Sequence, residues 1–198
     1  MVLKNLFDFV FSFVGLVVLS PLIIFAWAIA AIETRSNGFY FQKRVGLHGK
    51  LFKIIKIKTM KTHIGVNTVV TTLSDPRITK SGGFFRKTKI DELPQLWNIL
   101  IGQMSFVGPR PDVPGYADKL KGKDKMILSV RPGVTGPAQL IYRNEEQILQ
   151  NSLNAIEYNN EVLWPDKVRI NLNYIENNSL RKDFYYIWKT IFGGNVKY

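Results

Sequence analysis

The chain contains no cysteine and only two histidines among its 198 residues. Without cysteine it can form no disulfide, no thiolate metal site and no cysteine nucleophile. The two histidines, His48 and His63, are a poor supply for a histidine-rich zinc site or a Ser-His-Asp triad. Neither a P-loop nor a G-x-G-x-x-G segment occurs. These absences direct attention to the carboxylates and the basic side chains.

Long apolar runs are also scarce, and the one that exists lies near the N-terminus. The 24 residues from Phe9 to Ile32 carry no charge, and as a helix they would be about 36 Å long, enough for the hydrocarbon core of a bilayer. Pro21 in mid-run removes a helix hydrogen bond and predicts a kink, and Ser20 can satisfy the freed carbonyl. The residues alone favour a spanning helix over one that enters the membrane and returns, and they do not fit a cleavable signal peptide.

The formal charge is +12, and all of it lies after the apolar run, because Lys4 and Asp8 cancel. Such a charge predicts an anionic partner, which can be nucleic acid, an acidic lipid leaflet or a phosphorylated substrate. Eight Lys or Arg and no acid occur between residues 35 and 61, which is typical of a cytoplasmic flank. We therefore predict a membrane-inserted segment at 1–34 and one cytoplasmic domain at 35–198.

The rest of the chain predicts a mixed, helix-rich α/β domain. Residues 39–60 read as two strands joined by a turn over 46–49, and residues 62–73 as a variable loop. Residues 116–129 are typical of a basic helix, and the Asn-rich C-terminal helices are predicted to break at Trp164-Pro165. The aromatic-rich segment 183–192 fits a helix at the membrane interface and, equally, a helix packed in the core.

The centre of the sequence is the carboxylate pair Asp91 and Glu92. An apolar stripe at helical spacing follows the pair, with Pro94 suited to the first turn: Leu93, Leu96, Trp97, Leu100, Ile101 and Met104. The pair therefore lies at or just before a helix N-terminus, where the dipole should keep both groups ionised. Neighbours in sequence do not face each other on a helix, so the two carboxylates are expected to do different jobs. An isolated Asp-Glu would ordinarily be only an acidic cap.

Basic side chains around the pair change that interpretation. Arg86, Lys87 and Lys89 precede it, and Arg110 follows it between Pro109 and Pro111, which leave its backbone little freedom. Carboxylates for a metal ion or for nucleophilic attack, together with rigid guanidiniums for an anion, are typical of phosphoryl transfer.

The segments FFRKTKIDELPQLWNIL and MSFVGPRP resemble the signature of the bacterial sugar transferases, the monotopic phosphoglycosyl transferases of the small single-domain type. FKIIKIKTM and RPGVTGPAQ resemble two further family segments, so the resemblance covers the chain almost from end to end. It implies a re-entrant helix-break-helix at Ser20-Pro21, amphipathic interfacial helices, and a place on the cytoplasmic face of the bacterial inner membrane. This would reverse the preference for a spanning helix.

The resemblance also implies a reaction. Members transfer a sugar 1-phosphate from a UDP-sugar to undecaprenyl phosphate and release UMP, the first membrane step of glycan assembly, which downstream glycosyltransferases continue. Asp91 would be the nucleophile of a covalent phosphosugar intermediate, and Glu92, with Asp91, would hold Mg²⁺. The phosphate-binding residues would be Lys56, Arg86, Arg110 and Arg131, with a helix cap as the alternative role of Arg131.

Two further residues have weaker assignments, and the sugar is left open. Arg143 and Asp183 are possible substrate-binding residues, and Asp183 can equally be structural or lie near the metal. Tyr142 replaces a glycine common in the family, so the sugar of other members does not transfer to this chain. The alternative to catalysis is a membrane-tethered basic protein that binds nucleic acid or lipid. The chain carries no nucleic-acid-recognition motif, so we expect no nucleic-acid partner, whereas anionic lipids are expected ones.

Overall fold

The computed structural model describes residues 2–61 and 75–194, which divide into two compact units. The α1 unit comprises residues 6–42, 53–61 and 75–101, and the C-terminal unit comprises residues 2–5, 43–52 and 102–194. The fold is helix-rich and mixed α/β, as the sequence predicts. The predicted loop at 62–73 lies outside the described residues, and the boundary between residues 34 and 35 stays a prediction.

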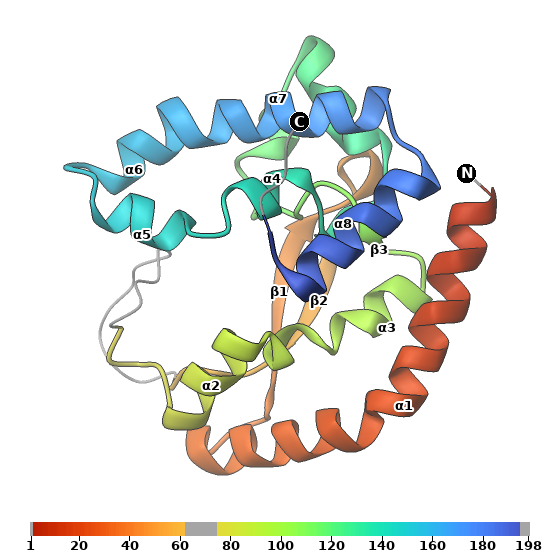
Figure 1. Ribbon diagram of the computed structural model, residues 1–198. Coiled ribbons are helices and arrows are strands. Elements are labelled where there is room, and N and C mark those ends of the chain that lie inside the picture. The colour runs from red at the N-terminus through yellow and green to blue at the C-terminus, as the bar shows by residue number, and fades with distance from the viewer. Residues whose placement is uncertain (1, 62–74, 195–198) are drawn as a thin grey trace. The chain divides into compact units, whose positions relative to one another are not determined.

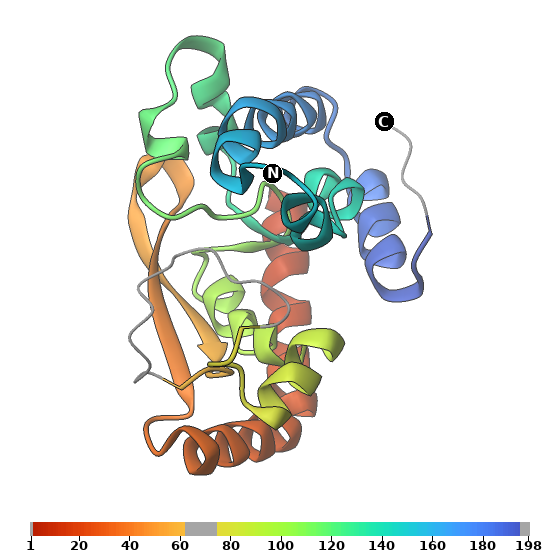
Figure 2. The same ribbon diagram turned by 90° about the vertical axis from the view of Figure 1, so that its left-hand side faces the viewer.

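Helix α1 (Val2–Thr34) contains the apolar run and bends about half-way along its length (Figures 1 and 2). Pro21 lies inside the helix, where its missing N–H leaves the carbonyl of Val17 without the usual partner. The Ser20 hydroxyl donates to that carbonyl over 2.9 Å. Within the described chain, α1 alone is long and apolar enough to cross a membrane by length and composition, and only 11% of its most apolar window is buried.

The core of the α1 unit lies against the second half of this helix. Ile23, Ala26 and Ala30 are buried together with Ile57 and Phe85. The two alanines leave room for the side chains of the strand and helix that pack there, while most large side chains of α1 point outward. A helix apolar on nearly all sides and covered on one side only needs another apolar medium on its remaining surface.

Strands β1 (Phe39–Val45) and β2 (Leu51–Ile57) form a two-stranded sheet, which confirms the two strands predicted over 39–60. Gly46 and the short 3-10 turn η1 (Leu47–Gly49) join them. Ile54 and Ile57 of β2 are 3% and 2% exposed, which fixes the strand against the rest of the α1 unit.

Helix α2 (Lys80–Thr88), the 3-10 turn η2 (Ile90–Glu92) and helix α3 (Gln95–Leu100) follow one another. Thr79 caps α2 by accepting a hydrogen bond from the Gly82 amide over 3.0 Å. Lys89 ends α2 with a φ of 60°, so the chain turns sharply before the carboxylate pair. Helix α3 is shorter than the apolar stripe over 93–104 predicts, and Gly102 follows it with a φ of 76°.

The apolar stripe over 93–104 is buried only in part: Met104 is 0% exposed and Leu93 packs against the core of the α1 unit. Trp97 and Ile101 of the apolar stripe are 50% and 49% exposed. Asp91, Gln95 and Asn98 are 8%, 2% and 1% exposed. Gln95 and Asn98 lie three residues apart on α3 and share a buried face, and Asp91 lies in the turn that precedes the helix.

In the C-terminal unit, the short strands β3 (Ser105–Val107) and β4 (Gly133–Thr135) pair in parallel. Their junction demands glycine, because a Cβ on Gly133 would lie 2.1 Å from the Gly108 amide nitrogen. The helix predicted over 116–129 is wrong in type, since the structure has 3-10 turns at Ala117–Lys119 (η3) and Gly122–Ser129 (η4). Lys121 is extended and Gly122 has a φ of 55°, so no continuous α-helix can form there.

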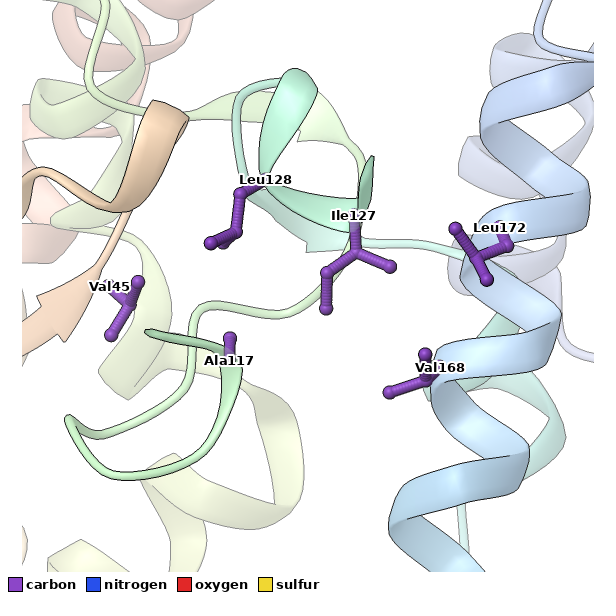
Figure 3. Close-up of a cluster of buried hydrophobic side chains, with 6 residues drawn as sticks. All are labelled: Val45, Ala117, Ile127, Leu128, Val168 and Leu172. Atoms are coloured by element: carbon purple, nitrogen blue, oxygen red, sulfur yellow. The ribbon is translucent and has the colours of Figure 1, made fainter. Parts of the chain in front are cut away.

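One hydrophobic cluster joins these turns to the helices that follow (Figure 3). Ala117 and the η4 residues Ile127 and Leu128 face Val45 from β1 on one side. Val168 and Leu172 of helix α7 complete the cluster on the other side. The end of β1 is thus anchored in the C-terminal unit.

Five helices and a π-turn complete the described part of the C-terminal unit. They are α4 (Pro137–Ile141), α5 (Glu145–Gln150), α6 (Ala155–Tyr158), the π-turn η5 (Asn159–Leu163), α7 (Trp164–Glu176) and α8 (Leu180–Phe192). Instead of a break at Trp164-Pro165, α6 and η5 run on into α7 (Figure 1). Pro165 lies at the start of α7, directly after the π-turn η5. Helix α8 buries Asp183 and Tyr186 and exposes a row of large apolar side chains: Phe184, Trp188, Ile191 and Phe192.

Candidate active site

The carboxylate pair lies in the 3-10 turn η2, directly before α3, as the sequence predicts. Asp91 is 8% exposed, and within the described residues its Oδ1 atom has no hydrogen-bond partner. Glu92 is half-buried and its Oε1 accepts a hydrogen bond from Lys56 Nζ over 2.9 Å. The two neighbours therefore differ in environment: Glu92 forms an ion pair with a lysine, whereas Asp91 is buried and its Oδ1 accepts no hydrogen bond.

Burial raises the pKa of Asp91 to about 6, and the adjacent charge of Glu92 adds to the rise. Lys56, Lys89 and Arg86 lower the same pKa, but by less. The helix dipole was expected to keep both groups ionised. At Asp91 the loss of solvent and the neighbouring carboxylate outweigh it. The basic side chains are what keep this buried carboxyl within reach of ionisation at neutral pH.

Three predicted residues converge on Asp91 within the α1 unit. Lys56 comes from β2, Arg86 from the last turn of α2, and Glu92 from η2. The left-handed backbone at Lys89 joins the turn to α2, which brings Arg86 close enough to influence the Asp91 carboxylate. Lys58 follows β2 directly, and its Nζ donates to Ser36 Oγ over 2.7 Å.

The C-terminal unit holds Arg110 on a loop whose backbone is bonded on both sides. The Gly133 amide donates to the Pro109 carbonyl over 2.8 Å. Arg44 of β1 donates to the Pro111 carbonyl over 3.1 Å. The arginine is exposed while both prolines beside it are buried, so a fixed backbone presents a guanidinium to solvent.

A second carboxyl with a raised pKa follows this loop. Burial raises the pKa of Asp112 to about 7, against the charges of Lys167, Arg44 and Arg110. Its carbonyl accepts from the Val45 amide over 2.9 Å, which ties it to the end of β1. Asp112 could not be singled out from its sequence context, because nothing there predicts that its side chain loses solvent.

Arg131 also belongs to the C-terminal unit. Its guanidinium donates to Asn5 Oδ1 over 3.2 Å and lies beside Gly102, where an added Cβ would come within 3.4 Å of it. It precedes Pro132 and strand β4, so the RPG turn that carries it is part of the parallel strand pair.

The two remaining predicted residues contact the protein itself. Arg143 donates to the Lys189 carbonyl over 2.9 Å, near the C-terminal end of α8, where a cation is favourable. Asp183 forms an ion pair with Lys4 and accepts from the Tyr174 hydroxyl over 2.6 Å. These contacts link the start of α1 and helices α7 and α8. They favour the structural interpretation of Asp183.

Oxygen donors for a hard cation are present at Asp91 and Glu92, but only as a pair. Among the described residues no cluster of three His, Cys, Asp or Glu could hold a metal ion. A magnesium ion accepts substrate phosphate and water oxygens alongside one or two carboxylates, so the pair fits it as a shared site. The unpartnered Oδ1 of Asp91 is the donor that such an ion would meet.

Sequence reasoning missed two buried residues near the pair, Gln95 and Asn98. Both lie on one buried face of α3, directly after the turn that carries Asp91. Their spacing was visible in the sequence, but the apolar stripe beside them gave the stronger signal for the buried side of the helix. Asn98 contacts strand β2 directly, through two hydrogen bonds.

Comparison with known proteins places this arrangement in a family. The model of the family described as "Bacterial sugar transferase" matches residues 1–195. A putative undecaprenyl-phosphate N-acetylgalactosaminyl 1-phosphate transferase of Bacillus subtilis is 39% identical over 61% of the chain and 68% of its own length. The UDP-glucose:undecaprenyl-phosphate glucose-1-phosphate transferase of Klebsiella pneumoniae is 34% identical over 99% of the chain. The undecaprenyl-phosphate galactose phosphotransferase of Salmonella typhimurium is 34% identical over 95% of it.

The chain spans 41% and 39% of the length of the last two relatives. The family match nevertheless covers nearly every residue, including the carboxylate pair, Arg110 and Arg131. The chain belongs to the bacterial sugar transferase family, and the protein is a transferase.

Proposed function

We propose that this protein transfers a sugar 1-phosphate from a UDP-sugar to undecaprenyl phosphate, forming undecaprenyl-diphosphate-sugar and UMP. The observation that carries the proposal is the buried Asp91 beside a lysine-paired Glu92 in one turn. The names of the three relatives cited above support the general reaction, and two of them name the sugar as glucose or galactose. The sugar of this chain is left open.

In the first step, the Asp91 carboxylate attacks the phosphorus that carries the sugar. The new bond joins a carboxylate oxygen to that phosphorus, the bond to the UMP oxygen breaks, and UMP leaves with the electron pair. Burial keeps the Asp91 carboxylate largely out of water, and the carboxylate oxygen that does not face the metal ion makes the attack. Lys56 and Arg86 stabilise the negative charge that shifts towards the leaving oxygen.

In the second step, a phosphate oxygen of undecaprenyl phosphate attacks the same phosphorus. A diphosphate bond forms, the acyl phosphate bond breaks, and the Asp91 carboxylate is regenerated. Arg110 and Arg131 are the proposed phosphate ligands from the C-terminal unit. The hydrogen bonds of the backbone on both sides of Arg110 fix the position of its Cα atom, which lowers the conformational entropy lost when the side chain binds phosphate.

Glu92, with the free oxygen of Asp91, would hold Mg²⁺ together with substrate oxygens. When bound, the ion neutralises charge on the diphosphate. Lys56 already forms an ion pair with Glu92, so the lysine holds the second carboxylate in place beside Asp91.

The lipid acceptor explains the exposed apolar helix α1. We propose that α1 enters the bacterial inner membrane from the cytoplasm, bends at Ser20-Pro21 and returns, so that the body stays on the cytoplasmic face. The Ser20–Val17 hydrogen bond makes the bend tolerable in lipid, because the freed carbonyl is satisfied. The exposed aromatic row of α8 fits the interface, the basic body fits anionic lipids, and downstream glycosyltransferases would take up the product.

Release of UMP from a panel of UDP-sugars, with undecaprenyl phosphate as acceptor, tests the function. We expect one or a few sugars to support turnover and Asp91→Asn to lower it by about three orders of magnitude. Asp124→Asn is the matched control, because Asp124 is exposed in η4. An Asp91→Asn variant as active as this control would remove Asp91 from the reaction, and no UMP release from any sugar would favour a lipid-binding protein without catalysis.

The proposed metal site predicts a change in metal dependence. Glu92→Gln keeps the size of the side chain but removes its charge, so the Mg²⁺ concentration for half-maximal activity should rise by about tenfold or more. A magnesium titration of UMP release measures it. An unchanged titration with lowered turnover would assign the ion to other residues.

A further inference from the structure

Asn98 is bonded to strand β2 through both ends of its carboxamide. Its Nδ2 atom donates to the Lys53 carbonyl over 2.8 Å, and its Oδ1 atom accepts from the Ile55 amide over 3.1 Å. The side chain is 1% exposed, so both bonds are shielded from water. All three residues belong to the α1 unit.

The two hydrogen bonds have the pattern that a neighbouring parallel strand would form with β2. In a parallel ladder one residue donates to and accepts from two residues of its neighbour that lie two positions apart. Strand β2 pairs with β1 in a two-stranded sheet, so its other edge has no strand partner within the described chain. The Asn98 carboxamide replaces one peptide group of such a partner and fixes the strand lengthwise against α3.

The residue next to this contact is Lys56. Its Nζ lies 2.9 Å from Glu92 Oε1, and Glu92 lies in the turn that leads directly into α3. Two adjacent residues of β2 are therefore held by two side chains of the η2–α3 segment, one at its start and one near its end. A slip of the strand by one residue would turn Lys56 to the opposite side of β2.

We propose that Asn98 is a positioning residue, which sets the register of β2 so that Lys56 meets Glu92 and the substrate diphosphate. This inference rests on the proposed function. Asn98 itself takes no part in the chemistry and acts through Lys56 alone. Gln95, its neighbour on the buried face of α3, has no such hydrogen bond to β2 within the part of the chain that the structure describes.

A double-mutant cycle on the first half-reaction tests the proposal. The variants are Asn98→Leu, Lys56→Met and the two together, with the rate of UMP release as the readout. We expect each single change to slow the reaction by about 30- to 100-fold, and the double variant to be no slower than Lys56→Met within about twofold. Effects that multiply would overturn the proposal, because Asn98 would then act independently of Lys56.

Two controls separate positioning from loss of folding. Asn171→Leu removes another buried asparagine, 5% exposed on α7, and its effect should multiply with that of Lys56→Met. If Asn98→Leu does not fold, Asn98→Asp replaces it, since it keeps the acceptor for the Ile55 amide and loses only the donor. The same lack of multiplication is expected for that variant, and multiplication would again overturn the proposal.

A readout without substrate keeps this inference distinct from the proposed function. The ammonium ¹H–¹⁵N signal of Lys56, assigned through Lys56→Met, should exchange slowly with water in the wild type because Nζ is bonded to Glu92. Asn98→Leu should abolish the slow signal, while Asn171→Leu should keep it. A slow signal retained in Asn98→Leu overturns the positioning role, even if wild-type UMP release has already confirmed the function. If the wild type releases no UMP, the function fails while this test of the contact still stands.

Discussion

Asp91 combines two properties that oppose each other at the scale of the single residue. Burial makes its oxygen a good nucleophile once ionised, and the same burial raises its pKa to about 6. Lys56 and Arg86 reduce the conflict without removing it. The carboxylate is thus ionised near neutral pH at a cost in stability, as is common where a fold maintains a reactive group.

That cost predicts how stability depends on pH in the metal-free protein. The pKa of Asp91 is higher in the folded than in the unfolded chain, so folding favours its protonated form. The contribution of Asp91 to the free energy of unfolding is fully present below about pH 4. It falls by up to about 3 kcal/mol as the pH rises through about 6. Asp91→Asn cannot ionise and should therefore be more stable than the wild type at pH 8, with little difference at pH 4.

Urea unfolding in detergent with EDTA at the two pH values measures this difference. Asp124→Asn, at an exposed position, should show no pH-dependent gain. If Asp91→Asn gained no stability relative to the wild type between pH 4 and pH 8, folding would not raise the pKa of Asp91, and the cost of burial would be contradicted.

At the scale of the element, short segments are held by backbone contacts that only small residues allow. The strand pair β3–β4 carries Arg110 after one strand and Arg131 before the other. The strands approach so closely at Gly108 and Gly133 that a side chain on Gly133 would overlap backbone. The loops that present both arginines depend on this approach.

Gly133→Ala should therefore destabilise the protein by about 3 kcal/mol or more and lower its affinity for the phosphates of the substrate. Thermal unfolding and the KM for the UDP-sugar measure the two effects. Gly83→Ala is the control, because Gly83 lies in helix α2 and, among the described residues, an added Cβ there would meet only Ile78 Cγ2 at 4.0 Å. It should be neutral or slightly stabilising. Equal effects of the two substitutions would show that the approach at Gly133 can relax.

The elements also show how far the sequence could predict the structure. The hairpin over 39–60 and the turn at the carboxylate pair were predictable, because strand alternation, glycine turns and Pro94 are local signals. The type of the turns at 116–129 was not, because an extended Lys121 and a left-handed Gly122 interrupt a pattern that local propensity would continue.

The exposure of Trp97 and Ile101 could not be read from the hydrophobic stripe either. That prediction assumes that water surrounds the protein, whereas an apolar face beside a membrane can remain outside. In the site, the Asp-Glu pair and its basic neighbours were visible as charges in a short segment. The raised pKa values of Asp91 and Asp112 and the contact of Asn98 depend on tertiary packing, which no local pattern contains.

At the scale of the whole molecule, one apolar helix and a strongly basic remainder share a chain without cysteine. The absence of cysteine makes topology accessible to labelling at single introduced thiols. Leu3 is 64% exposed at the start of α1, and Lys50 is exposed in the turn between β1 and β2. A re-entrant helix puts both on the cytoplasmic face, whereas a spanning helix puts Leu3 outside.

We expect a membrane-impermeant maleimide to label neither Leu3→Cys nor Lys50→Cys in intact spheroplasts, and both after lysis. Labelling of Leu3→Cys alone in intact spheroplasts would establish a spanning helix. Pro21→Ala in the Leu3→Cys background should move the first position towards outside labelling, because the bend loses its cause.

The account depends most on a covalent bond between Asp91 and the phosphosugar. Wild-type protein incubated with its UDP-sugar and Mg²⁺, without lipid acceptor, should gain the mass of one sugar phosphate, and peptide mapping should locate it on Asp91. Addition of undecaprenyl phosphate should discharge it. An enzyme that turns over but shows no adduct, or carries it on any residue other than Asp91, would contradict the account.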